Sequence, residues 1–317
     1  MPHRRSTAVL ASVAALAIAG TLAPARTSAV QWGPDYFPNV TLTTQDGKTV
    51  RFYDDLLKGK IVAIDLIYTH CKYSCPLETA RLAQVQRLLG DRVGKDIFFY
   101  SITLDPERDT PEVLKAYAQK FHAGPGWLFL TGKKEDIKLI GHKMGLLSAS
   151  ADPAPINRDG HTPELMIGNV ATGTWMRNSA VDNAQLLATT MRRSFAAPDH
   201  AGPAKTYAQA RELSVSKGQY LFTTRCAACH TIGHGDGLGP DLLGVTHARD
   251  RAWLTRFIQF PDRVMASGDP VAKALSARYN GLQMPNVGLG PEDVAALIDH
   301  IEARSAAQSG SSLAASH

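Results

Sequence analysis

The chain has 317 residues, of which 44% are hydrophobic and 20% are charged, a composition typical of a globular protein with room for about two domains. The formal net charge is +5, but Arg4, Arg5 and Arg26 lie in the first 29 residues, so the chain from Val30 onward carries only +2. No dense run of Lys and Arg occurs beyond that segment, which argues against nucleic-acid binding.

The first 29 residues have the pattern of a secretion signal. A positive start over residues 3–5 precedes an Ala-rich apolar run, Ala8 to Ala23, and the small residues Thr27, Ser28 and Ala29 follow. The run of 16 residues is shorter than the roughly 20 that span a bilayer. We expect cleavage after Ala29 and a periplasmic protein, rather than one anchored to the membrane by an uncleaved leader. In that compartment thiols can be oxidised and haem can be attached covalently.

Strand-like and helix-like stretches alternate through the first half of the chain. Asp46-Gly47 predicts a hairpin turn, and the apolar run Ile61 to Tyr68, which contains a single acid, predicts a strand covered on both faces. A cysteine loop follows, and then a helix that starts near Pro76. This order indicates a thioredoxin-like α/β domain over residues 30–196. The other elements predicted there are a strand over 97–104, a helix from Thr110-Pro111 to about Phe121, short strands over 127–130 and 165–167, and a closing helix over 181–195.

The loop Cys71-Lys72-Tyr73-Ser74-Cys75 lies between the predicted strand end and the helix N-terminus. The unpaired N–H groups and the dipole of a helix N-terminus stabilise a thiolate, so both cysteines can be reactive. They could form a structural disulfide or bind a soft metal. Two thiolates and a neutral imidazole make a three-ligand site suited to copper, and His161 is the candidate for the imidazole.

Several motifs occur here in the order found in one family. Residues 69–76, Thr-His-Cys-Lys-Tyr-Ser-Cys-Pro, are followed by residues 105–111, Asp-Pro-Glu-Arg-Asp-Thr-Pro, and then by His161-Thr162. This region resembles the Sco/SenC family of copper-binding assembly proteins. The resemblance implies that Cys71, Cys75 and His161 hold one copper ion, and that the protein helps to build the copper centre of cytochrome oxidase. Some members of the family are instead credited with thiol-disulfide exchange.

The second cysteine motif is Cys226-Ala-Ala-Cys229-His230, which has the spacing of a c-type haem attachment site. The two thiols would bond the porphyrin, and His230 would be an axial iron ligand. A zinc site is the alternative for such a motif in isolation. The secretion signal and a following Gly239-Pro240 favour one covalent haem c.

Residues 214–304 resemble a small all-α class I cytochrome c. The resemblance implies that Pro240 orients His230 and that a distant Met is the second axial ligand. Met284 is the candidate because it stands in a Met-Pro pair before the final predicted helix, and Met265 is the rival. That helix, which Pro291 begins, is expected to pack on the helix containing Gly218 and Phe222. Residues 197–213 read as a linker and residues 305–317 as a flexible tail.

Electron counting separates the functional hypotheses. Conversion of a dithiol to a disulfide moves two electrons, whereas one haem accepts one, as does Cu(II). The leading hypothesis is a periplasmic copper-binding assembly factor whose haem c exchanges single electrons with the copper. Its partner would be the copper-centre subunit of cytochrome oxidase or another periplasmic copper or thiol protein. One alternative is an enzyme, a thiol-disulfide oxidoreductase in which Cys71 and Cys75 are catalytic and the haem relays electrons. Another is an electron carrier in which the first domain has no redox role and serves only as a docking module.

Overall fold

A computed structural model describes residues 32–33, 35–147, 163–194 and 214–314. The predicted secretion signal and linker lie outside these ranges. In the part of the chain that is described, no helix is both long enough and apolar enough to cross a membrane. The region before residue 195 and the region from residue 214 are described separately below.

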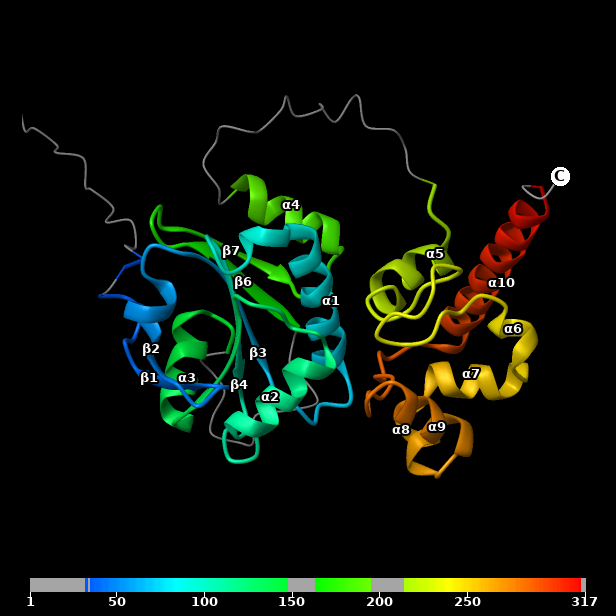
Figure 1. The fold of residues 1–317 in the computed structure, drawn as a ribbon, viewed down its shortest axis with the longest axis horizontal. Helices are drawn as coiled ribbons and strands as arrows, with labels where there is room; N and C mark the ends of the chain where they lie inside the picture. Colours follow the sequence, from blue (N-terminus) through cyan, green and yellow to red (C-terminus); the bar gives the residue numbers. More distant parts are fainter. Residues whose placement is uncertain (1–31, 34, 148–162, 195–213, 315–317) are drawn as a thin grey trace, which may run out of the picture. The chain divides into compact units, whose positions relative to one another are not determined.

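The first region is built on one seven-stranded mixed sheet with the order β2-β1-β5-β4-β3-β6-β7 (Figure 1). The three central strands β3, β4 and β5 run parallel, and the outer pairings are antiparallel. Every residue of β3 is buried, as its apolar sequence predicts. The strands are β1 Thr41–Thr44, β2 Thr49–Arg51, β3 Ile61–Ile67, β4 Ile97–Thr103, β5 Trp127–Gly132, β6 Glu164–Asn169 and β7 Thr174–Ser179.

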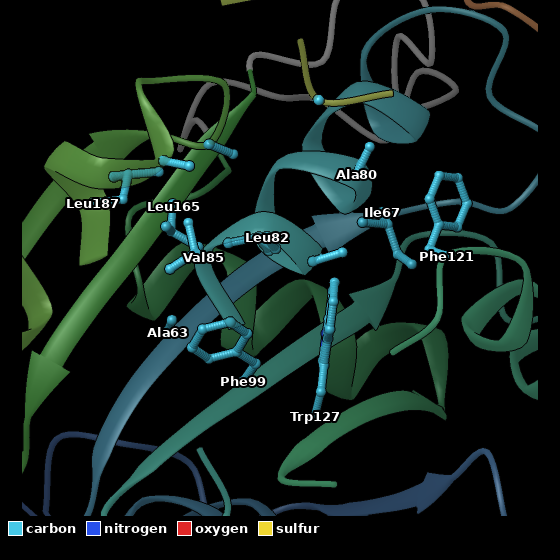
Figure 2. Packing of buried hydrophobic residues seen from close by; sticks show 14 of the residues in the cluster. Ala63, Ile67, Ala80, Leu82, Val85, Phe99, Phe121, Trp127, Leu165 and Leu187 are labelled. Atoms are coloured by element: carbon cyan, nitrogen blue, oxygen red, sulfur yellow. The ribbon is translucent and has the colours of Figure 1, made fainter. Parts of the chain in front are cut away.

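Helices cover both faces of the sheet. One face of β3, with Ala63 and Ile67, joins side chains of α1, α2 and α4 in a core that also contains Phe99 and Trp127 (Figure 2). The opposite face packs on α3 and on the helical turn η1. This arrangement is the thioredoxin-like α/β fold that the sequence predicts. The bounds are η1 Phe52–Leu57, α1 Ser74–Leu89, η2 Gly90–Arg92, α2 Pro111–Lys120, α3 Lys134–Lys143 and α4 Ala184–Ser194.

Local signals in the sequence place several of these elements correctly. Thr110 caps α2 by accepting a hydrogen bond from the N–H of Val113, and Pro111 occupies the first turn. Gly47 forms the predicted hairpin turn with a φ of 75°. The cysteine-bearing helix α1 begins at Ser74, two residues before the predicted start, so Cys75 lies inside its first turn.

The second region is all-helical (Figure 1). Its core joins Leu254 and Ile258 of α7 to Val294, Leu297 and Ile298 of α10. The predicted packing of the first and last helices is confirmed, because a Cβ at Gly218 would lie 2.1 Å from the carbonyl oxygen of Ala296. The bounds are α5 Lys217–Leu221, η5 Phe222–Cys226, α6 Val245–Ala248, α7 Arg251–Gln259, α8 Pro261–Ala266, α9 Pro270–Arg278 and α10 Pro291–Ala314.

The prediction of a flexible tail from residue 305 is wrong, because α10 continues to Ala314. Ser305 is buried and accepts a hydrogen bond from the N–H of Gly244, and Gln308 donates one to the carbonyl of Ile232. The Ala, Ser and Gly content of these residues suggests disorder, but their Ala residues also suit a helix once such tertiary contacts hold one face in place.

Candidate functional site

The cysteine loop connects the end of β3 to the start of α1. The N–H of Cys71 donates to the carbonyl of Tyr68, which closes a turn after the strand. Cys71 is 7% exposed and Cys75 is fully buried. Tyr73 precedes the helix and offers no side-chain cap, but its N–H donates to the Sγ of Cys71 at 3.4 Å. The sulfur therefore accepts a backbone N–H from the residue just before the helix.

The two thiols differ in acidity because each acts on the other. A hydrogen bond from Cys75 lowers the pKa of Cys71 to about 5, and the N–H groups of Cys75 and Tyr73 act in the same direction, while burial opposes them. The same contact raises the pKa of Cys75, with further contributions from burial and from the charge of Glu78. At neutral pH the pair therefore consists of a thiolate at Cys71 and a thiol at Cys75.

A buried acidic side chain, Asp109, holds the residues that lead into the cysteine loop. Asp109 is fully buried and accepts hydrogen bonds from the N–H and the hydroxyl of Thr69, at 3.1 and 2.6 Å, and from the hydroxyl of Thr103 at 2.5 Å. Asp109 thereby ties the residues just before Cys71 to the end of β4. Asp109 therefore links the turn before α2 to the cysteine loop.

His70, the residue next to Cys71, pairs with acidic groups. Its Nε2 lies 3.0 Å from an oxygen of Asp105, and its Nδ1 lies 3.8 Å from Asp109. An Nη1 of Arg108 lies 3.3 Å from the same Nε2. These contacts tie the ring of His70 to the turn that precedes α2.

The predicted third ligand, His161, lies outside the described residues. Within the described ranges no three His, Cys, Asp or Glu side chains are grouped so that they could hold a metal ion. Cys71 and Cys75 are both free thiols whose sulfurs interact with each other. A thiolate and a neighbouring thiol are the soft donors that Cu(I) prefers, so these two residues fit a copper ion.

In the helical region, Cys226 and Cys229 sit where η5 gives way to the turn that contains His230. The Nδ1 of His230 lies 2.9 Å from the carbonyl oxygen of Pro240. Burial lowers the pKa of His230, so the imidazole is neutral, and Nδ1 carries the proton donated to this carbonyl. The arrangement leaves Nε2 as the free ligand nitrogen. Only glycine fits at position 239, where a Cβ would lie 2.7 Å from Cε1 of His230.

The apolar cavity beside these residues fits a haem. Cys226, His230 and Met284 line it together with aromatic and aliphatic side chains such as Trp253. Met284 lines both cavities that adjoin Cys226 and His230, whereas the rival Met265 lines only one of them. Cys229 lines the adjoining cavity together with Cys226, His230 and Met284. Two free thiols, a neutral imidazole held through Nδ1 and a thioether are the groups that a covalent haem c requires.

Comparison with known proteins identifies both regions. A family model described as SCO1/SenC matches residues 31–160, and one described as Cytochrome c matches residues 215–305. The SCO2-like protein of Rickettsia felis is 30% identical over 150 residues, which cover 45% of this chain and 68% of the relative. The SCO1 protein homolog of Bacillus subtilis is 37% identical over 93 residues, 29% of this chain and 47% of that relative. The chain belongs to the SCO1/SenC family.

Solved structures resemble each region separately. A SCO1/SenC family lipoprotein from Bacillus anthracis is 29% identical, covering 52% of this chain and 95% of that one, with a TM-score of 0.43. The cytochrome c domain of the pp3183 protein from Pseudomonas putida is 47% identical, covering 28% of this chain and 88% of that one, with a TM-score of 0.27. The two family models place a cytochrome c domain after the SCO1/SenC domain of this chain.

Sequence reasoning missed a group of buried polar side chains in the SCO1/SenC domain. Asp65 is the single acid in the apolar run of β3, and it is 1% exposed. Glu78, in the second turn of α1, is fully buried. A lone acid in a strand covered on both faces is the signal that could have drawn attention to Asp65, since burying a charge is costly. Glu78 stands among polar and apolar residues in the sequence and gives no such signal.

Proposed function

We propose that this protein is a periplasmic copper-binding assembly factor for the copper centre of cytochrome oxidase, and that its cytochrome c domain exchanges single electrons with the copper. The observation that supports copper binding most directly is the pair Cys71 and Cys75. These two sulfurs interact in a loop at a helix N-terminus, where one is held as a thiolate. Copper is the cargo in this proposal, and His161 would complete its ligand set.

The cytochrome region supplies the second half of the proposal. Cys226 and Cys229 would hold the haem, and His230 and Met284 would bind its iron. A haem with His and Met ligands has a raised reduction potential and takes up one electron. Oxidation of Cu(I) to Cu(II) releases one electron, so the stoichiometries match. The periplasmic location follows from the predicted secretion signal and from the requirement for covalent haem attachment.

A copper titration tests this function. Haem-loaded protein with ferric iron is titrated with Cu(I) under anaerobic conditions while the haem absorption bands are recorded. We expect one haem reduced per copper bound, and no reduction in the double variant Cys71→Ser/Cys75→Ser. Copper binding that leaves the haem spectrum unchanged would contradict electron exchange between the sites.

A pair of histidine variants tests the third ligand. His161→Ala should weaken Cu(I) binding, whereas His142→Ala, at an exposed position in α3, should leave it unchanged. Binding is measured by competition with a chromophoric Cu(I) chelator. Equal affinities for the two variants would remove His161 from the ligand set.

The unequal pKa values of the two cysteines favour a second candidate, a thiol-disulfide oxidoreductase. A low-pKa thiolate attacks a partner disulfide, and a buried thiol then resolves the mixed disulfide. This candidate predicts turnover without copper, loss of turnover in Cys71→Ser and in Cys75→Ser, and normal turnover in His161→Ala. Turnover that depends on copper would exclude it.

A further inference from the structure

The loop that follows His230, between α5 and α6 in Figure 1, winds around the side chain of Asp241. Oδ1 of Asp241 accepts hydrogen bonds from the N–H of Gly233 at 2.7 Å and from that of Leu243 at 2.9 Å. Oδ2 accepts one from the N–H of Gly235 at 2.6 Å. One carboxylate thus joins the glycine-rich part of the loop to the part that leads into α6.

Glycine makes this arrangement possible. Gly233 and Gly235 have φ angles of 79° and 82°, in the left-handed region that other residues rarely adopt. Backbone N–H groups in turns that contain such residues converge on a hollow that receives an anion. Here the anion is the side chain of Asp241. Burial acts to raise the pKa of Asp241, but its hydrogen bonds outweigh this effect and lower the pKa, so the group is a carboxylate at neutral pH.

Asp241 shares a peptide group with the hydrogen-bond partner of His230. The carbonyl oxygen of Pro240 lies 2.9 Å from Nδ1 of His230. This carbonyl and the N–H of Asp241 lie in one plane, because the peptide bond between them is rigid. The N–H donates to Oδ1 of Asp236 at 3.0 Å, which sets the orientation of the plane. The anchored side chain of Asp241 fixes the Cα at one end of the plane, so the two contacts together place the carbonyl oxygen against the imidazole.

Two backbone hydrogen bonds hold the chain on either side of this peptide group. The N–H of Gly239 donates to the carbonyl of Cys229 at 2.9 Å, and the N–H of Leu242 donates to the carbonyl of Thr231 at 2.8 Å. They keep the loop beside the cysteine motif. The carboxylate acts between them, at the residue whose peptide group meets His230. Loss of the carboxylate should therefore leave the loop in place and loosen the Pro240 carbonyl.

We propose that Asp241 is the positioning residue for the haem ligand His230. Its carboxylate keeps the Pro240 carbonyl in contact with Nδ1, and a hydrogen bond at Nδ1 makes the other ring nitrogen, Nε2, a more basic ligand. A more basic imidazole favours the ferric over the ferrous state, so Asp241 lowers the reduction potential of the site. The inference rests on the proposed haem site and deepens the proposed electron exchange, because this potential decides how readily the cytochrome domain accepts an electron from Cu(I).

The negative charge of Asp241 could lower the potential without any positioning, since Asp241 lines the same cavity as His230. The two effects differ at Nδ1. A charge acting through space leaves the hydrogen bond between His230 and Pro240 intact, whereas loss of positioning exposes the Nδ1 proton to exchange with water. The potential and the proton exchange rate must therefore be measured on the same variants.

The test uses the full-length, haem-loaded, copper-free protein. The midpoint potential is measured by spectroelectrochemical titration, and the exchange of the His230 Nδ1 proton is measured by proton NMR of the ferrous form. In Asp241→Ala the ferrous-to-ferric ratio at a fixed ambient potential should rise by about tenfold, the lower end of the effect of removing a residue behind a metal ligand. This ratio corresponds to a shift of about 59 mV for one electron. The Nδ1 proton should exchange faster than in the native protein.

Asp241→Asn separates positioning from charge. Asn carries no charge but keeps one oxygen, which can still accept from the N–H groups of Gly233 and Leu243 as Oδ1 does in the native protein. Positioning predicts a potential and an exchange rate between those of the native protein and those of Asp241→Ala. Charge alone predicts equal potentials in the two variants and native proton exchange in both.

Asp250→Ala is the matched control. Asp250 also accepts a backbone N–H in this domain, from Trp253 at 2.8 Å, as the N-cap of α7. Its loss should lower the stability of the domain because a helix cap is removed. The midpoint potential and the exchange rate of the His230 proton should stay native.

Native values of both quantities in Asp241→Ala would overturn the inference, and so would equal potentials in the two Asp241 variants with native proton exchange. If Asp241→Ala does not retain haem, native proton exchange in Asp241→Asn overturns it. The copper titration separates this result from the proposed function. If copper leaves the haem spectrum unchanged and the Asp241 variants shift both quantities, electron exchange is wrong and the inference stands. If Cu(I) reduces the haem and the variants behave as native, only the inference is wrong.

Discussion

Gly218→Ala tests the packing that holds the cytochrome domain together. A Cβ at this position would lie 2.1 Å from the carbonyl oxygen of Ala296 and 2.8 Å from Cβ of His300. Both atoms belong to α10 and neither is the end of a flexible side chain, so α5 and α10 must move apart. Overpacking of this kind costs about 1–3 kcal/mol. Contact with rigid backbone places this cost in the upper half of that range, at about 2–3 kcal/mol. The higher helix propensity of Ala returns about 1 kcal/mol, so the free energy of unfolding should fall by about 1–2 kcal/mol.

For a domain of this size, that loss lowers the melting temperature by about 5–15 °C. We would measure it by scanning calorimetry of the full chain, with haem absorption to identify the cytochrome transition. Gly290→Ala is the matched control, because its Cβ would meet only an oxygen of Asp293, at 3.6 Å. Equal melting temperatures for Gly218→Ala and the native protein would refute the close approach of the two helices.

Three further predictions follow from the sites. Alkylation of Cys71 should rise with pH through about 5, because the hydrogen bond from Cys75 lowers the pKa of Cys71, while Cys75 should stay unreactive. Mass spectrometry of the two cysteine-containing peptides measures the extent of alkylation. A midpoint near 8.5 for Cys71 would contradict the lowered pKa. Asp109→Ala leaves buried donors without their acceptor and should destabilise the SCO1/SenC domain by about 2–4 kcal/mol in urea unfolding; an unchanged midpoint would show that these bonds are dispensable. Met284→Ala should remove the absorption feature of a Met-ligated ferric haem, whereas Met265→Ala should retain it. The reverse result would make Met265 the axial ligand in place of Met284.

Elements of the fold were predictable where the sequence carries a local physical signal. The apolar run of β3 and the Thr110-Pro111 start of α2 are such signals, and both elements occur as expected. α3 and β7 were missed, because β7 is a largely exposed strand and α3 begins without a side-chain cap. α1 starts at Ser74, before Pro76, and no side-chain cap marks that start, so residue patterns for helix starts do not place it.

Only the site residues that belong to a sequence motif could be predicted. The spacing of the cysteine motifs that contain Cys71, Cys75 and His230 predicts the metal or haem chemistry of these residues. The buried hydrogen bond between Asp65 and Ser101 joins residues 36 positions apart, which meet only through the register of two parallel strands. No local pattern encodes such a register.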